Sequence, residues 1–247
     1  MKKTAIVSVA LAAALFAVSC QKENGEKFKA DVSYGALPGK FSVSDTKKVN
    51  FSKGNLTYNV STATWAFYEH QYDCATGYDS NLISLFTWGY GTWSTSPDSK
   101  NYQTGDFTDW GSQIGDGKTW RTLSKDEWTY LFNTRTVNGG TGKDKSYSLN
   151  ITYGEKMGLV LYPDNYTGSV LSGTVEALPE GIVFLPAAGS RNGSNVNNVG
   201  HIGLYWPSTA CDSDCAYRVH FVRDVVYPDL ITYRNIGYSV RLVTECQ

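Results

Sequence analysis

The most informative stretch of the chain reads Trp120-Arg121-Thr122-Leu123-Ser124-Lys125-Asp126-Glu127-Trp128-Thr129-Tyr130-Leu131. Ser124, followed three residues later by Glu127, has the pattern of a capping box, in which each side chain binds the backbone N–H group of the other residue. Trp128 and Leu131 then recur at the spacing of one helical face. We therefore predict a helix that begins after Ser124 and ends before the glycine-rich residues 138–142.

Short β-strands are predicted on both sides of this helix. Leu56 and Tyr58 alternate with polar residues, as in a strand with one buried face. Similar patterns predict strands at residues 64–68, 149–153, 158–162, 182–185, 204–206, 217–221 and 238–243. Tyr-Pro-Asp occurs twice, at residues 162–164 and 227–229, and we interpret both copies as turns. One or two helices among scattered short strands predict an α+β domain and not a parallel α/β fold.

The composition narrows the class of protein. The chain has 247 residues, of which 41% are hydrophobic and 14% aromatic. Such a chain has enough apolar surface to fold, and its length suits one domain. Its 22 basic residues are balanced by 23 acidic residues. This balance argues against a nucleic-acid partner, because binding to phosphates requires an excess of positive charge.

The N-terminus has the features of an export signal. Lys2 and Lys3 precede an apolar run at residues 5–18, which is too short to span a bilayer but typical of a secretory signal. Small residues directly precede Cys20, and this junction resembles the lipobox of bacterial lipoproteins. That resemblance implies that Cys20 is diacylated and becomes the first residue once the signal is cleaved; the alternative is a plain signal peptide with an incidental cysteine.

The chain is therefore expected to have three parts. Residues 1–19 form a lipoprotein signal peptide, residues 20–27 the lipidated cysteine and a polar tether, and residues 28–247 the folded domain. Charged residues after Cys20 resemble the surface-export signal of Bacteroidota lipoproteins. We expect a lipid anchor in the cell outer membrane. The sequence leaves open whether the domain faces the cell surface or the periplasm.

Four cysteines remain after lipidation, and an even number in an exported protein favours disulfides. We favour Cys211–Cys215 as a local link and Cys74–Cys246 as a link between an early segment and the C-terminus. A zinc site is the competing interpretation, but Cys-x3-Cys without a matching histidine pair is poor metal spacing.

Several boxes in the sequence resemble a known superfamily. The stretch that begins at Trp120 is similar to the Arg-Leu-Pro-Thr-x-x-Glu-Trp-Glu-Tyr helix entry of the formylglycine-generating enzyme (sulfatase-modifying factor) superfamily. The other boxes are Phe51-Ser52-x-Gly54-Asn55-Leu56, Arg191-Asn192-Gly193, Tyr205-Trp206-Pro207-Ser208-Thr209 and Gly237-Tyr238-Ser239-Val240-Arg241. The set most resembles Bacteroidota lipoproteins with the Fibrobacter succinogenes major paralogous domain. The resemblance covers residues 45–245 and implies a single C-type-lectin-like α+β domain with short antiparallel strands, few helices and much irregular backbone.

The enzymatic chemistry of that superfamily is not expected here. Cys211 and Cys215 lie where the copper-dependent oxidases carry a cysteine pair, and thiolates suit Cu(I). However, three residues separate them where the oxidases have four. Asp212 and Asp214 would raise the pKa of the neighbouring thiols and not activate them. We therefore expect no catalytic residues, no cofactor and no metal, and leave the oxidase as a remote alternative.

The lectin-like fold suggests carbohydrate binding as a second chemistry. A calcium-dependent site needs a dense set of oxygen ligands, and the motifs that supply them in lectins are absent. Calcium-free binding uses aromatic faces together with amide and guanidinium groups. Candidate residues of these types lie in a glycine-rich loop and in an asparagine-rich loop: Trp88, Tyr90, Trp93, Arg191, Asn192 and Asn195. Tyr205 and Trp206, in contrast, lie in a family box and are expected to pack in the core.

These observations predict a non-enzymatic lipoprotein of the cell envelope. We expect it to bind a glycan, or a protein of the host or cell envelope, at the cell surface, and to contact the membrane through its lipid. The alternative is a structural or fimbria-associated assembly component. Both expectations rest partly on fold analogy, which suggests a function without establishing it.

Overall fold

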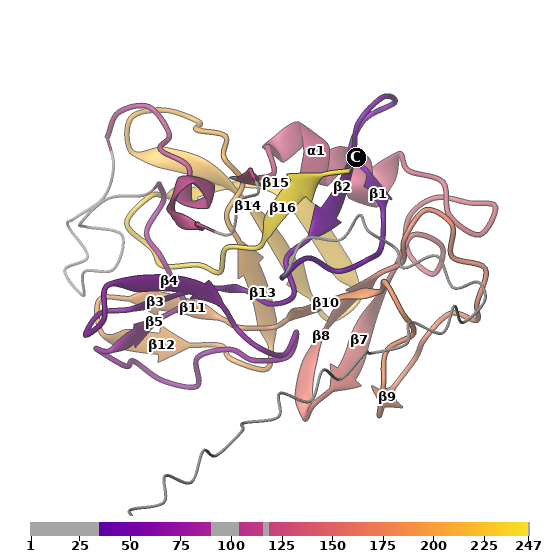
Figure 1. The fold of residues 1–247 in the computed structure, drawn as a ribbon, viewed down its shortest axis with the longest axis horizontal. Coiled ribbons are helices and arrows are strands. Elements are labelled where there is room, and N and C mark those ends of the chain that lie inside the picture. The colour runs from indigo at the N-terminus through magenta and orange to yellow at the C-terminus, as the bar shows by residue number, and fades with distance from the viewer. Residues whose placement is uncertain (1–34, 90–103, 116–118, 247) are drawn as a thin grey trace, which may run out of the picture. The chain divides into compact units, whose positions relative to one another are not determined.

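The computed structural model describes residues 35–89, 104–115 and 119–246. These residues belong to one compact unit within Asp31–Gln247. Within them lie one α-helix, α1 (Lys125–Asn133), one 3₁₀ helix, η1 (Trp110–Gln113), and sixteen short strands in five sheets (Figure 1). The predicted α+β class is confirmed at this level, since the regular secondary structure of the described residues consists mainly of short antiparallel strands, with a single α-helix.

One sheet joins the two ends of the described chain. Its strand order is β1 (Phe41–Ser42), β2 (Lys48–Phe51), β16 (Leu242–Glu245) and β6 (Trp120–Thr122), and all pairs are antiparallel. The C-terminal strand therefore lies between an early strand and the strand that leads into α1. This arrangement places the start of α1 at the sheet that closes the domain.

Two further sheets and a hairpin are built from neighbouring segments. One sheet has the order β10 (Val183–Pro186), β8 (Lys156–Leu161), β7 (Tyr147–Tyr153) and β9 (Thr174–Val175), with β7 and β9 parallel. A second sheet has the order β4 (Thr64–Phe67), β3 (Leu56–Asn59) and β5 (Leu82–Ile83). The hairpin consists of β11 (Ser190–Asn192) and β12 (Asn195–Asn197).

The fifth sheet carries the longest strand of the described residues. Its order is β13 (Ile202–Tyr205), β14 (Cys215–Val222) and β15 (Val225–Tyr233), so β15 is an edge strand. The register between β14 and β15 shifts between Arg218 and His220. Two residues of β15 therefore lie opposite one residue of β14, which is the geometry of a β-bulge.

The predicted start of α1 is confirmed in atomic detail. The Ser124 side chain accepts a hydrogen bond from the Glu127 N–H at 3.2 Å, and the Glu127 carboxylate accepts one from the Ser124 N–H at 2.8 Å. Arg121 donates two further hydrogen bonds to the same carboxylate, at 2.7 and 2.8 Å. Glu127 thus caps the helix and also links it to β6.

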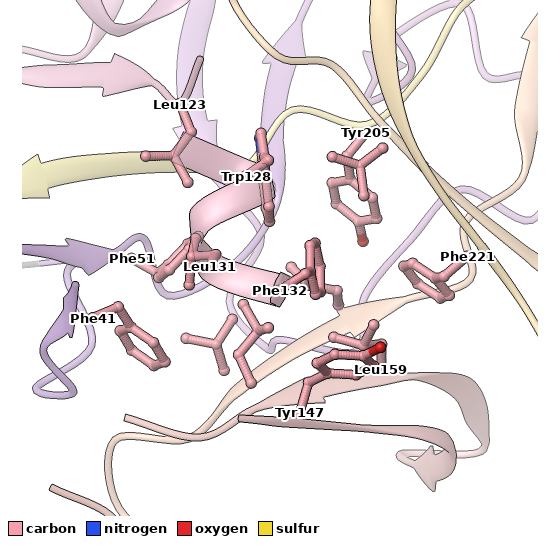
Figure 2. Close-up of a cluster of buried hydrophobic side chains, with 14 of the residues drawn as sticks. Phe41, Phe51, Leu123, Trp128, Leu131, Phe132, Tyr147, Leu159, Tyr205 and Phe221 are labelled. Atoms are coloured by element: carbon pink, nitrogen blue, oxygen red, sulfur yellow. The ribbon is translucent and has the colours of Figure 1, made fainter. Parts of the chain in front are cut away.

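The helix packs against a core cluster drawn from distant parts of the chain. Its buried face consists of Trp128, Leu131 and Phe132. Figure 2 shows these side chains beside Phe51 of β2 and Tyr147 of β7. Phe132 makes an edge contact with Tyr147, with ring centroids 5.2 Å apart, as aromatic pairs prefer. The helix therefore joins several sheets into one core.

The expectation for Tyr205 and Trp206 is confirmed, since both rings are buried. The Tyr205 hydroxyl donates a hydrogen bond to the Pro186 carbonyl at 2.8 Å. Burial raises the pKa of this hydroxyl well above its ordinary value. The Trp206 indole N–H donates to the carbonyl of Phe86 at 2.6 Å. These rings therefore serve packing between sheets.

One turn prediction and one strand prediction are corrected by the structure. The second Tyr-Pro-Asp, at residues 227–229, is not a turn but part of β15. Proline is tolerated there because β15 is an edge strand and Pro228 lies at the register shift, where ladder hydrogen bonds are interrupted. The strand predicted at residues 238–243 is shorter and lies later in the chain, since β16 spans Leu242–Glu245. The hairpin formed by β11 and β12 was not predicted.

Candidate functional site

The aromatic residues predicted as a ligand platform do not form one among the described residues. Trp88 is fully buried, its indole N–H donates a hydrogen bond to the Pro207 carbonyl at 3.0 Å, and the Arg234 guanidinium lies 4.2 Å from its ring. Trp88 therefore presents no ring face to solvent, and its place in a glycine-rich segment was misleading. Tyr90 and Trp93 lie outside the described residues, and so does Cys20.

Arg191, another predicted ligand residue, is also buried. Its guanidinium donates to the Leu85 carbonyl at 2.8 Å and to the Gly193 carbonyl at 3.0 Å. Burial lowers the pKa of this group. Arg191 therefore anchors the hairpin to the body of the domain. The other two predicted residues of the hairpin, Asn192 and Asn195, pair with each other and are exposed.

Asn192 lines a cleft of ligand size, whereas Arg191 lines only a much smaller one of about 10 Å³. The cleft at Asn192 has a volume of about 410 Å³ and is lined by Asn192, Asp214, Tyr233, Asn235 and Ile236. We call it the Tyr233 cleft. Tyr233 is the most exposed large hydrophobic side chain of the described residues, with 66% of its surface accessible. The volume lies in the range of about 300–1,000 Å³ that is usual for small-ligand sites.

A close backbone approach brings the hairpin to this cleft. The N–H of Arg191 donates to the Gly237 carbonyl at 2.8 Å, and the N–H of Gly237 donates back at 2.7 Å. A Cβ atom on Gly237 would lie 2.9 Å from both the Arg191 Cβ and the Leu85 carbonyl oxygen. Glycine is required there because any side chain would push the hairpin away from the turn that follows β15.

Asp214 of the cleft lining belongs to a loop shaped by Asp212. The Asp212 carboxylate accepts hydrogen bonds from the N–H groups of Asp214, at 2.9 Å, and Cys215, at 2.7 Å. These bonds lower the pKa of Asp212. Such a side-chain-to-backbone turn fixes the loop conformation, so Asp214 is presented at the cleft in a defined position.

Arg234 holds this loop against the rest of the domain. Its guanidinium donates to the carbonyl oxygens of Cys215 and Gly105, each at 3.1 Å, and to that of Asp212. The Arg234 N–H donates to the Asp214 carbonyl at 2.9 Å. Arg234 therefore positions residues on both sides of the loop, while the neighbouring Tyr233 is exposed.

The lining of the Tyr233 cleft combines an aromatic ring with a carboxylate and two carboxamides. Carboxylates accept hydrogen bonds, and carboxamides both donate and accept them. This combination suits a ligand with several hydroxyl groups. Among the residues that the structure describes, no group of three or more histidine, cysteine, aspartate or glutamate side chains is placed to hold a metal ion.

A larger cleft lies at the start of α1, and we call it the α1 cleft. Its volume is about 650 Å³, and its lining includes Asp109, Arg121 and Glu127. Asp109 accepts hydrogen bonds from the N–H groups of Gly111 and Thr122, both at 2.9 Å. Glu127 is occupied by the capping box and by Arg121. The main charged groups of this cleft therefore stabilise the fold.

The four described cysteines are free thiols in the structure. Cys211 and Cys215 lie opposite each other at the base of a tight loop, with the Cys211 N–H donating to the Cys215 carbonyl at 3.0 Å. Desolvation, Asp212 and the neighbouring thiol raise the pKa of Cys215. A raised pKa lowers the fraction of reactive thiolate, which argues against an activated cysteine pair.

Cys74 and Cys246 have different surroundings. Burial raises the pKa of both thiols. The Cys246 thiol donates to the Asn50 carboxamide oxygen at 3.3 Å, whereas the pKa of Cys74 is also influenced by the charges of Lys156 and Asp73. Their pairing stays a prediction, as does that of Cys211 with Cys215.

The described residues contain no helix long and apolar enough to cross a membrane. Comparisons of the chain with protein-family models, with curated proteins and with solved structures find no match.

Proposed function

We propose that this chain is a non-enzymatic lipoprotein of the cell envelope that binds a glycan in the Tyr233 cleft. The observation that carries the proposal is the exposed Tyr233 ring beside Asn192, Asp214 and Asn235. The boxes quoted above support membership of the formylglycine-generating enzyme superfamily and a C-type-lectin-like fold. The lipobox-like sequence before Cys20 supports a lipid anchor in the outer membrane.

The chemistry of the cleft favours a sugar over an apolar ligand. One face of a pyranose ring presents C–H groups, which an aromatic ring can contact, and its edges present hydroxyls. Asp214 and the two carboxamides would bind those hydroxyls. An apolar ligand would cover the same polar groups without replacing their hydrogen bonds to water, which costs free energy.

The experiment is a glycan-array screen of the full chain, followed by titration of each hit against variants. Tyr233→Ala is expected to weaken binding by about 2 kcal/mol, or about thirtyfold, the effect of removing a central aromatic contact. Tyr227→Ala is the matched control, since Tyr227 is 44% exposed on the same strand but does not line the cleft. A hit that Tyr233→Ala leaves unchanged would contradict the proposed site.

A structural or assembly role is the second candidate, and the edge strand β15 favours it. Val225, Tyr227 and Ile231 are 41%, 44% and 52% exposed on this strand. Exposed apolar side chains on an unpaired strand edge favour contact with another protein. Sedimentation of the full chain, alone and with other envelope proteins, tests this role; a monomer at all concentrations without a partner would count against it.

A further inference from the structure

A second cleft lies along β4, at the edge of the sheet formed by β4, β3 and β5. Its volume is about 430 Å³, and its lining includes Trp65, Phe67, Ile114, Lys53 and Glu69. We call it the Trp65 cleft. None of these residues was singled out as a ligand contact from the sequence, and none lines the Tyr233 cleft.

The aromatic part of this cleft is held in place by packing. Trp65 and Phe67 are alternate residues of β4, so their side chains share one face of the strand. The Trp65 ring packs 4.6 Å from Tyr58, and the Phe67 ring packs 4.8 Å from Trp120. Both side chains are nevertheless only partly buried. The cleft thus has a preformed aromatic wall with accessible surface.

The charged part is an ion pair between Lys53 and Glu69. The Lys53 side chain is 27% exposed and that of Glu69 is 74% exposed. A tight backbone approach brings the two segments together, since a Cβ atom on Gly54 would lie 2.3 Å from the Tyr68 carbonyl oxygen. The Tyr68 N–H also donates to the Asn55 carbonyl at 2.9 Å. Backbone contacts therefore set the position of the pair.

Glu69 keeps its negative charge at neutral pH. Its hydrogen bond with Lys53 lowers the pKa of the carboxyl group. A carboxylate has about four acceptor positions, so it can bind ligand hydroxyls while it remains paired with Lys53.

We propose that the Trp65 cleft is a second carbohydrate subsite, which takes a neutral pyranose against Trp65 and Phe67 with its hydroxyls on Glu69 and Lys53. The inference rests on the proposed function, because it adds a second contact for the same class of ligand. Two weak subsites on one domain bind a polysaccharide more tightly than either does alone. A purely apolar ligand fits less well, since it would desolvate the ion pair.

The test is saturation-transfer NMR on the full chain with four probes: the methyl glycosides of glucose, galactose, mannose and N-acetylglucosamine. The Tyr233→Ala variant serves as the background, because it removes the main contact of the other cleft. We expect at least one glycoside to receive saturation in this background. Adding Glu69→Gln should weaken its binding by about tenfold, as for the loss of a hydrogen bond to a charged group.

Two further variants keep the result interpretable. Trp65→Ala should abolish the remaining transfer, but Trp65 supports neighbouring rings, so its folding must be checked by circular dichroism. Glu69 is largely exposed, so Glu69→Gln should leave the fold intact. Glu155→Gln is the matched control, since Glu155 is an exposed carboxylate in the turn between β7 and β8 and does not line the cleft.

The outcomes separate this inference from the proposed function. If the wild type shows saturation transfer to a glycoside and Tyr233→Ala abolishes it, the second subsite is overturned and the Tyr233 cleft is supported. If the saturation transfer is unchanged in Tyr233→Ala and lost when Glu69→Gln is added, the second subsite is supported and the result counts against the Tyr233 cleft. Transfer that survives both substitutions, or no transfer to any glycoside in the wild type, would overturn the inference.

Discussion

The α1 cleft and the Tyr233 cleft differ in how their polar side chains are used. In the α1 cleft, Glu127 caps the helix and receives two hydrogen bonds from Arg121. In the Tyr233 cleft, the ring of Tyr233 projects into solvent and Asn192 lies at an exposed hairpin turn. The α1 cleft is the larger, with about 650 Å³ against 410 Å³. Volume alone is therefore a poor guide to a ligand site, because polar groups engaged within the fold, such as Glu127, have less capacity for a ligand.

The largest expected effect tests the structural role of the α1 cleft. Glu127→Ala should lower the free energy of unfolding by about 3 kcal/mol, because it removes two charge-assisted hydrogen bonds of Arg121, which keeps only Glu245 as an ionic partner, and half of the capping box. Urea denaturation measures this change. Glycan binding should stay unchanged in the folded protein.

Asp126→Asn is the matched control for Glu127→Ala. Its side chain is 86% exposed and pairs only with Lys125 among the ion pairs of the described residues, so the change should stay within about 0.5 kcal/mol. Equal effects of the two substitutions would contradict the role given to Glu127.

The next effect concerns the loop that carries Asp214. Oxidation of Cys211 and Cys215 by exchange with a low-molecular-weight disulfide should close a loop of five residues, 211–215, and stabilise the fold by about 2 kcal/mol. Mass spectrometry of an unreduced digest identifies the link, and Cys211→Ser should abolish the stabilisation. The same digest tests Cys74–Cys246; a reduced Cys211 under oxidising conditions would refute the local pairing.

Asn192 gives a smaller effect on binding. Asn192→Ala should weaken glycan binding by about 1 kcal/mol through the loss of one neutral hydrogen bond, with stability unchanged. Asn195→Ala is the control, because Asn195 pairs directly with Asn192 across the hairpin but does not line the cleft. Comparable losses from the two variants would show that hairpin structure, and not a contact in the cleft, governs affinity.

The smallest effect is a pH dependence of stability that belongs to neither cleft. Within the described residues, neither ring nitrogen of His220 has a hydrogen-bond partner. Burial and Arg218 lower its pKa below the ordinary value of 6.5. The unfolded chain therefore binds this proton more readily, so the stabilisation is present above pH 6.5 and is lost as the pH falls through the lowered pKa.

In His220→Phe, the free energy of unfolding should depend less on pH between neutral pH and the range in which carboxylates titrate. Chemical denaturation at a series of pH values measures the profile. His201→Asn changes an exposed histidine and serves as the control. An unchanged slope in His220→Phe would assign the pH dependence to other groups.

The sequence predicted α1 well because its signals are local. Ser124 and Glu127 are three residues apart, so their interaction can be recognised without knowing the fold. The strand β15 was not predicted, because a proline usually marks a turn, and only the edge position with its register shift makes Pro228 acceptable.

The candidate site was only partly predictable, because most of its residues come together through contacts between segments that are distant in the sequence. Asn192 was identified by its asparagine-rich loop, but Tyr233 and Asp214 join it through contacts between distant segments, such as that of Arg191 with Gly237. The alternation of apolar residues along β15 was the available signal for Tyr233. Trp88 failed as a prediction because Arg234 and Pro207, both remote in sequence, enclose it.

The most direct test of the central claim is an NMR titration of the ¹⁵N-labelled chain with the strongest glycan-array hit. The account predicts that the largest shift changes occur at the side-chain amides of Asn192 and Asn235, with none at the backbone amides of Ser124 and Glu127. Shift changes concentrated around Glu127 would place the ligand in the α1 cleft and contradict the account, and so would an array without any hit.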